Sequence, residues 1–194
     1  MGRCRFPSGI LLLLARESGD PQVLGPALHS AALIERAAGD LAAARRLVEE
    51  CAQAPSLLGS PPHLAVGLPD AVSICAATDS LDLAERLLQA SEHPSARARH
   101  SLLTARAILA EARGKPDEAA PLNAQASEAW REFGNVPEQA RALLGQGRCL
   151  VALGRPGAAK PLREARGLFA SLDDRCALAE TEALLEQTAA ASAS

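Results

Sequence analysis

Aromatic residues are almost missing from this 194-residue chain, which has one Trp, three Phe and no Tyr. Hydrophobic residues still make up 48% of it, so the packing must come from Leu and Ala, which are strong helix formers. The lack of rings also removes the platforms on which single-stranded nucleic acid stacks. The composition therefore predicts an all-helical protein and makes a nucleic-acid partner unlikely.

An excess of one charge and closely spaced cysteines are missing as well. The chain has 20 basic and 23 acidic residues and a formal charge of −3, which provides no drive toward nucleic acid or an anionic membrane. Its five cysteines lie far apart with no Cys-x-x-Cys pair. We interpret them as free core thiols in a reducing compartment and expect a cytoplasmic protein, in preference to a disulfide framework or a zinc site.

A long apolar run is also lacking. Arg3 and Arg5 precede the run from Ile10 to Leu14, which would suit a signal peptide. The run is short, however, no Ala-x-Ala site follows it, and residues 15–20 read as the end of a helix. Because a membrane helix needs about 20 apolar residues, we predict no membrane association.

Catalytic motifs are not found either. Gly114-Lys115 is followed by Pro116 instead of the hydroxyl residue of a phosphate loop, and Gly145-x-Gly147 lies inside a helical pattern, where helix packing explains it. The four histidines form no His-Glu-x-x-His motif, and no Gly-x-Ser-x-Gly motif exists. We predict that the chain is not an enzyme and holds no cofactor or metal.

What the sequence does contain is a unit repeated four times. Counting from the turn residues Gly39, Asp79, Gly114 and Gly154, the same residue types recur at fixed positions. Spacings of three and four on each side of the turn mark two helical faces, so each unit is a helical hairpin. The matched columns are Leu28, Leu68, Leu103 and Leu143 at −11; Ile34, Ile74, Leu109 and Cys149 at −5; Ala37, Ala77, Ala112 and Ala152 at −2; Ala44, Ala84, Ala119 and Ala159 at +5; and Leu47, Leu87, Leu122 and Leu162 at +8.

The turn residues predict where the helices end. Gly and Asp tolerate the left-handed conformation that closes a helix, and such residues recur mostly at steps of 20. The full series is Gly19, Gly39, Gly59, Asp79, Pro94, Gly114, Gly134, Gly154 and Asp174. The expected helices are 10–18, 21–38, 40–51, one that is bent by Pro69 or begins late near Asp70, 81–90, 95–113, 116–133, 137–153, 156–172 and 175–187.

Both ends of the chain differ from this pattern. We expect disorder in residues 1–8 and 189–194, a repeat domain over 9–188, and a final capping helix with Leu178, Leu184 and Leu185 inward and Glu180, Glu182 and Glu186 outward. At the other end, either the helix with Leu11 to Leu14 buries itself on the first hairpin, or the chain is the tail of something longer, which we favour.

The repeat columns resemble the tetratricopeptide repeat, with a large apolar residue early in the first helix and a small one four positions later (Ala32, Val72, Ala107 and Gly147). This resemblance implies a right-handed α-solenoid of about four tetratricopeptide-like hairpins plus the capping helix. The period of about 40 residues exceeds the usual 34, and the consensus aromatics are missing.

Residues 20–188 also resemble the C-terminal repeat tail of large bacterial ATPase-containing regulators. The likeness lies in the stretch from Glu128 to Gly134, in the Leu-Gly-Arg-Pro turn and in the Ala-Arg-Gly-Leu-Phe helix. Activators of the MalT and LuxR type and ATPase-linked nucleotide cyclases carry such tails. The resemblance implies a non-catalytic protein-interaction or scaffolding module; the alternative is a domain that binds an effector or nucleic acid.

Arginines spaced by seven mark the expected binding face. Arg99, Arg106 and Arg113, and then Arg141, Arg148 and Arg155, each follow one side of a first helix. By the resemblance, first helices line a concave groove, where an acidic protein or peptide would contact His29, Arg36, Thr104, Glu111, Arg141 and Arg148. The alternative is that these arginines pair with Glu111 and Glu138. If they form the groove, exchanging Arg141 and Arg148 for Glu should weaken partner binding and leave stability intact; otherwise the apolar N-terminal helix is the next docking edge.

Overall fold

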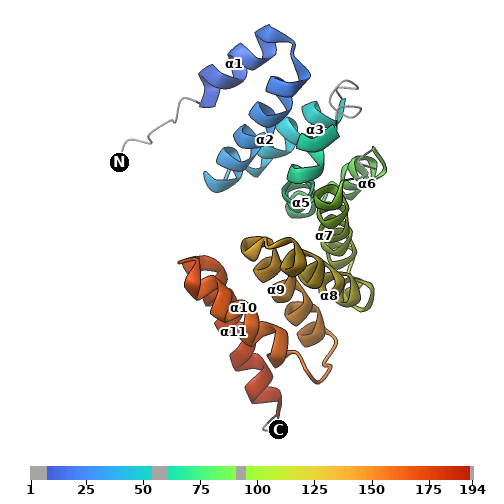
Figure 1. Ribbon diagram of the computed structural model, residues 1–194, viewed down its shortest axis with the longest axis vertical. Helices are drawn as coiled ribbons and strands as arrows, with labels where there is room; N and C mark the ends of the chain where they lie inside the picture. The colour runs from blue at the N-terminus through green and yellow to red at the C-terminus, as the bar shows by residue number, and fades with distance from the viewer. Residues whose placement is uncertain (1–7, 54–60, 91–94, 193–194) are drawn as a thin grey trace. The chain divides into compact units, whose positions relative to one another are not determined.

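The computed structural model describes residues 8–53, 61–90 and 95–192, and every regular element in these ranges is an α-helix (Figure 1). The prediction of an all-α protein is therefore confirmed. The helices are α1 (Ser8–Ser18), α2 (Pro21–Ala37), α3 (Leu41–Gln53), α5 (Pro61–Ala77), α6 (Leu81–Ala90), α7 (Ala96–Ala112), α8 (Pro116–Phe133), α9 (Val136–Ala152), α10 (Ala159–Ser171) and α11 (Arg175–Ser192).

The chain divides into two compact units, Met1–Ala105 and Arg106–Ser194. In the first unit α1 packs on α2, α2 on α3 and α5 on α6, and α5 also contacts both α2 and α3. In the second unit α8 packs on α9, α9 on α10 and α10 on α11, while α11 also contacts α9 (Figure 1). Each unit is therefore assembled largely from helices that are neighbours in the sequence.

Left-handed residues close the helices where the turn series predicts them. The φ angle is positive at Gly19, Gly39, Asp79, Gly114, Gly134 and Gly154. The last turn differs by one residue, because Asp173 takes the positive φ of 53° and Asp174 does not. Instead, the carboxylate of Asp174 accepts a hydrogen bond from the Ala177 N–H at 3.1 Å and so caps α11. The predicted turns at Gly59 and Pro94 lie outside the described residues.

Most repeat columns are buried in the two cores. Leu28, Leu68 and Leu143 are at most 5% exposed, and the alanine column is fully buried at Ala44 and Ala84. The alanines at −2, by contrast, are exposed in all four copies. Burial in the core therefore does not explain why alanine recurs at this position. Ile34 is likewise 37% exposed, although its equivalents Ile74, Leu109 and Cys149 are buried.

Helix α5 contradicts the expectation of a late start near Asp70. It begins at Pro61 and continues through Pro69 to Ala77. An internal proline costs an isolated helix about 3 kcal/mol. Leu68 and Val72, on either side of Pro69, are buried, and the helix packs on α2, α3 and α6. This tertiary burial offsets the local cost of the proline.

The C-terminal helix is longer than predicted. Helix α11 continues to Ser192, so residues 189–192, which we expected in a disordered tail, are helical. Its leucines pack on the α9–α10 core as expected of a capping helix. Glu180, Glu182 and Glu186 are exposed as predicted, and Glu180 also pairs with Arg148 of α9. At the other end α1 includes Ser8, and residues 1–7 lie outside the described part.

Helix α10 contradicts the predicted start at Pro156. Residues 156–158 form a turn in which Gly157 has a φ of 96°, and the helix begins at Ala159. As a result Ala158 is buried at 3% exposure, while Ala159, the predicted column residue, is half-buried. The corresponding helix α8 does begin at its proline, Pro116.

Candidate interaction surfaces

Two predicted contact residues of the first unit, His29 and Arg36, lie beside one aspartate. His29 and Arg36 lie on α2, and Asp70 lies on α5. The Nε2 atom of His29 is 3.6 Å from one Asp70 oxygen, and a guanidinium nitrogen of Arg36 is 3.9 Å from the other. The ring of His29 also lies against Gly67, where a Cβ atom would come within 2.6 Å of Nδ1. These side chains therefore join α2 to α5.

Thr104 does not belong to an accessible surface. It is 4% exposed, and its hydroxyl donates a hydrogen bond to the carbonyl oxygen of His100 at 3.1 Å. A partner cannot reach a side chain that is buried in this way, so the structure removes Thr104 from the predicted contact set.

Arg148 of α9 links three helices of the second unit. Its guanidinium binds both carboxylate oxygens of Glu111 on α7, and it also donates to Glu180 on α11 at 2.6 Å. The hydrogen bonds that Arg148 donates to Glu111 raise the pKa of the guanidinium above its already high value, which keeps the side chain charged. Two of the predicted contact residues, Glu111 and Arg148, are therefore engaged with each other.

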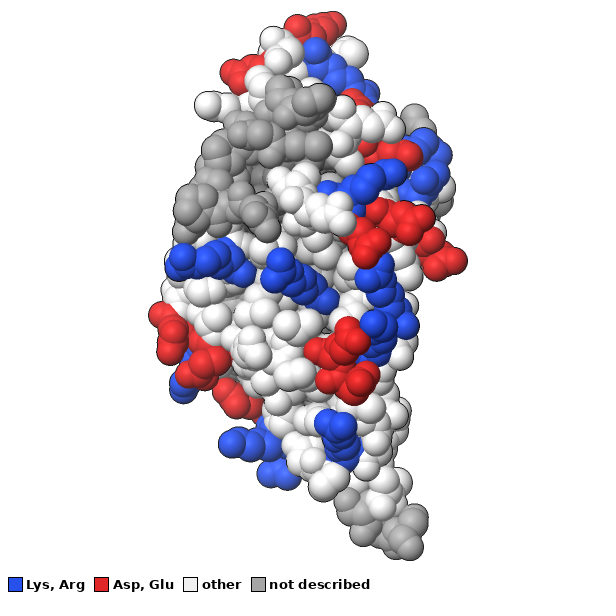
Figure 2. Space-filling view, turned by 90° about the vertical axis from the view of Figure 1, so that its right-hand side faces the viewer, with Lys and Arg blue, Asp and Glu red and all other residues white. Residues whose placement is uncertain are grey.

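Arg141 is exposed and forms a simpler pair, with its guanidinium 2.7 Å from Glu138 one turn earlier on α9. The interpretation that these arginines pair with Glu111 and Glu138 is thus confirmed for Arg148 and Arg141, respectively. On the face shown in Figure 2, basic and acidic side chains are interspersed with uncharged surface instead of forming a field of one sign. Two of the six arginines in the predicted series, Arg141 and Arg148, therefore pair with glutamates of the chain itself.

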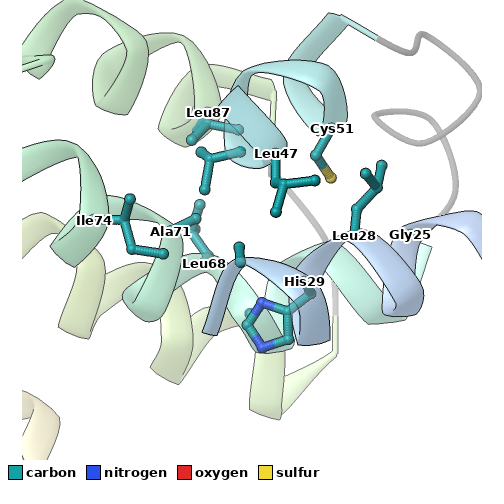
Figure 3. Close-up of a pocket in the computed structure, with 12 residues that line it drawn as sticks. Gly25, Leu28, His29, Leu47, Cys51, Leu68, Ala71, Ile74 and Leu87 are labelled. Atoms are coloured by element: carbon teal, nitrogen blue, oxygen red, sulfur yellow. The ribbon is translucent and has the colours of Figure 1, made fainter. Parts of the chain in front are cut away.

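A small apolar cavity lies within the first unit, between α2, α3, α5 and α6 (Figure 3). Its volume of about 30 Å³ suits a water molecule better than an organic ligand. The thiol of Cys51 points toward Leu28 and Leu47, whereas the ring of His29 hangs from the other side of α2 (Figure 3). Burial raises the pKa of Cys51 to about 11, which is the opposite of what a nucleophilic cysteine needs.

Helix α1 presents an apolar surface. Leu12 and Ala15 are buried against α2 and Cys51, so the helix is docked on the first hairpin. Ile10, Leu11, Leu13 and Leu14 point outward and are each at least 56% exposed. We call these four residues the α1 apolar face. Exposed apolar clusters of this kind mark interaction sites more often than isolated apolar residues do.

A second hollow lies in the second unit, where the start of α10 meets the ends of α9 and α11. We call it the α10 groove; it has a volume of about 540 Å³ and is lined by residues that include Leu150, Val151, Arg155, Ala158, Arg163 and Leu185. No acidic side chain is among its described lining residues. The groove therefore combines an apolar wall with two positive charges.

Sequence reasoning missed the α10 groove for two reasons. The spacing of Arg155 indicates a place in the arginine series of a first helix, and the small residues 189–192 favour a disordered tail. Asp70, which holds His29 and Arg36, was noted only as a possible helix start. The pairing of Asp70 depends on how α2 and α5 pack, so no local pattern could have revealed it.

No family model matches the sequence, and no curated protein is significantly similar to it. Among the described residues, no group of three or more His, Cys, Asp or Glu side chains is arranged to hold a metal ion. None of the described helices combines the length and the hydrophobicity that spanning a membrane requires.

Proposed function

We propose that this chain is a non-catalytic protein-interaction module built from tetratricopeptide-like hairpins, stacked as a right-handed α-solenoid. The burial of most members of the Leu column at −11 and of the Ala column at +5 supports this architecture, because it repeats one packing solution in successive hairpins. From the resemblance of residues 20–188 to regulator tails, we further propose a regulatory or scaffolding role in a bacterial signalling or transcriptional regulator.

The observation that carries the interaction role is the α1 apolar face. Four large apolar side chains on one short helix are at least 56% exposed, although the same helix buries Leu12 and Ala15. Keeping such a cluster in water is unfavourable by roughly 25 cal/mol per Å² of apolar surface. Binding of a partner that covers the face would gain that free energy. The α1 apolar face is therefore a better candidate for the binding surface than the first helix of each hairpin, where Arg141 and Arg148 are already paired with glutamates.

The test is capture of a partner by the intact chain and by a Leu11→Gln/Leu14→Gln variant. We expect the variant to keep its helical signal and melting temperature, because both leucines are exposed, and to lose the partner. The partner should be identified by mass spectrometry, purified and measured again by calorimetry.

A matched control is Leu41→Gln/Leu172→Gln, which removes two other exposed leucines. If this control loses the partner to the same degree, the binding surface is not α1. A panel of nucleotides and oligonucleotides at physiological salt tests the rival function, since saturable nucleic-acid binding without any protein partner would replace our proposal.

The concave face requires a revised mutational test. Arg148→Glu would place three carboxylates together, so we expect it to destabilise the second unit by about 1 kcal/mol or somewhat more. Arg141→Glu breaks only one exposed pair and should cost below about 0.5 kcal/mol. Thermal melts of the two single variants separate these cases, and equal melting temperatures would show that the three-helix ion pairing contributes little.

A further inference from the structure

We propose that the α1 apolar face is a self-association surface, on which α1 packs in antiparallel orientation against α1 of a second copy of this chain. This inference rests on the interaction role proposed above and names the partner. The face lies entirely within the first unit, and its most exposed member is Ile10, at 64%.

The face occupies one side of a helix that is fixed to the protein by its other side. At about 100° per residue, the four members of the face fall within roughly 160° of the helix circumference. Leu12 and Ala15 point the opposite way and are buried in the core of the first unit. Arg16 donates two hydrogen bonds to the Glu50 carboxylate on α3, from Nε at 2.8 Å and from Nη2 at 2.5 Å. The face is therefore presented in one orientation, and binding does not have to order the helix first.

The charge on α1 selects the antiparallel orientation. Glu17 is exposed, lies on the same side of the helix as the apolar face and pairs with no described residue. It belongs to the last turn, where the helix macrodipole disfavours a carboxylate, whereas the first turn of α1 has no acidic residue. In an antiparallel pair, Glu17 of each copy lies beside the positive end of the other copy's α1. A parallel pair would instead bring the two Glu17 carboxylates together.

The antiparallel pairing also makes the face complementary to itself. With the two-fold axis level with Leu12, Ile10 of one copy lies opposite Leu14 of the other. Leu11 and Leu13 each meet their own counterpart, one on either side of the axis. Every member of the face is then covered, and no charged residue lies between Ile10 and Leu14 in the sequence. Because a two-fold contact uses the same patch on both copies, this one patch provides the complete interface.

The size of the face predicts how strong the dimer is. Exposed apolar patches of roughly 300–600 Å² are often functional, whereas a stable interface buries about 800 Å² on each partner. The face consists of four side chains on a single helix of 11 residues, so it belongs to the smaller class. We expect reversible association with a dissociation constant on the order of 10–100 µM.

Sedimentation equilibrium of the full chain tests the dimer. Between about 5 and 500 µM, which brackets the expected constant, the apparent mass should rise from that of one chain toward that of two. The Leu11→Gln/Leu14→Gln variant should associate at least about tenfold more weakly, because it removes apolar contacts from both copies. The Leu41→Gln/Leu172→Gln control should associate as the unaltered chain does. The mass of one chain at every concentration, or an equal loss in the control, would overturn the dimer.

Glu17→Gln tests the orientation. It removes two favourable charge–dipole interactions from an antiparallel dimer, so the dissociation constant should rise about threefold or more. In a parallel dimer the same change would relieve a repulsion, and tighter association, or no change, would overturn the antiparallel arrangement. Glu182→Gln is the matched control, because it removes the same charge from an exposed position on α11 in the second unit. An equal rise in this control would assign the effect to net charge and overturn the orientation as well.

The failure of the dimer can be told apart from the failure of the proposed function. If the chain stays monomeric while the Leu11→Gln/Leu14→Gln variant loses a different, identified protein, the dimer is overturned and the interaction role of α1 stands. If the chain stays monomeric and the variant captures as much partner as the unaltered chain, both are overturned.

Discussion

The turns that precede α8 and α10 begin with equivalent residues and have different structures. Gly114-Lys115-Pro116 leads directly into α8, which starts at the proline. Gly154-Arg155-Pro156 leads into a further turn, and α10 starts three residues after the proline. Neither helix has a side-chain cap, so capping does not explain the difference.

The residues after the proline do explain it. In α8 they are Asp117 and Glu118, which interact favourably with the helix macrodipole, and Glu118 also pairs with Lys115 at 3.0 Å. At the equivalent positions α10 has Gly157 and Ala158, and Gly157 takes a left-handed conformation that no helix contains. Acidic residues in the first turn thus favour a start at the proline in α8, whereas glycine disfavours it in α10.

The largest expected difference is between the reactivity of Cys149, which packs at the start of α8, and that of the exposed Cys176. Cys149 packs against Ala119 and Ala120 at the start of α8, and burial raises its pKa from 9.0 to about 11. Two pKa units reduce the thiolate fraction by about 100-fold at pH 8, so a thiol reagent should label Cys149 at least 100-fold more slowly than the exposed Cys176. Mass spectrometry of timed samples measures both rates.

The raised pKa of Cys149 predicts that the stability of the fold depends on pH. A thiol whose pKa is raised in the folded chain stabilises the fold fully below its unfolded pKa near 9 and loses that contribution as the pH rises through about 11. Denaturant melts should show this decline, and Cys149→Ala should reduce it while Cys176→Ser should not. An unchanged slope in Cys149→Ala would mean that this thiol does not titrate in that range.

The next largest effect is on stability and concerns Ala119 and Ala159, the alanines five positions after the turn glycines Gly114 and Gly154. Ala119 is fully buried, so Ala119→Leu should destabilise the second unit by about 1–3 kcal/mol through overpacking. Ala159 is half-buried because α10 starts late, and Ala159→Leu should cost clearly less. Ala158→Leu, at the residue that is buried in its place, should match Ala119→Leu. Equal melting temperatures for the Ala119 and Ala159 variants would mean that the two helix starts are equivalent after all.

The smallest expected effect on stability comes from exchanging residues that follow Pro116 at the start of α8 and Pro156 before α10. Gly157→Asp should favour a helix that starts at Pro156 and stabilise it by about 0.5–1 kcal/mol; Ala158 is kept, because a carboxylate at this buried position would be destabilising. The reciprocal Asp117→Gly should weaken the start of α8 by a similar amount. Amide hydrogen exchange at residues 157–159 and 117–119 checks both, and unchanged protection would contradict our explanation.

Much of the helical architecture could be predicted from residue pattern alone. The turn series located the left-handed residues at Gly39, Gly114 and Gly134, because only glycine and a few polar residues adopt that conformation easily. The packing interpretation of the Gly145-x-Gly147 pair is also confirmed. A Cβ atom on Gly145 would lie within 2.8 Å of the Asn123 side chain, and one on Gly147 would overlap Leu162.

The predicted contact residues were less successful, for a different reason. Residue spacing names Glu111 as one possible partner of the arginines but does not decide the pairing, because Glu111 and Glu180 lie 37 and 32 residues from Arg148 in the sequence. Thr104 looked polar and exposed, yet it is buried. Ion pairing and burial depend on which helices meet, and the spacing of residues along one helix does not contain that information.

By itself, the sequence determined that the chain is helical and where most of its turns lie, since helix propensity and left-handed tolerance are local properties of each residue. Only the tertiary structure decided that Pro69 stays inside α5, that Ala158 replaces Ala159 in the core, and that Arg148 is paired while Arg155 pairs with no described residue. These outcomes depend on the burial and charge that neighbouring helices bring together, and such interactions outweigh local preferences of a few kcal/mol.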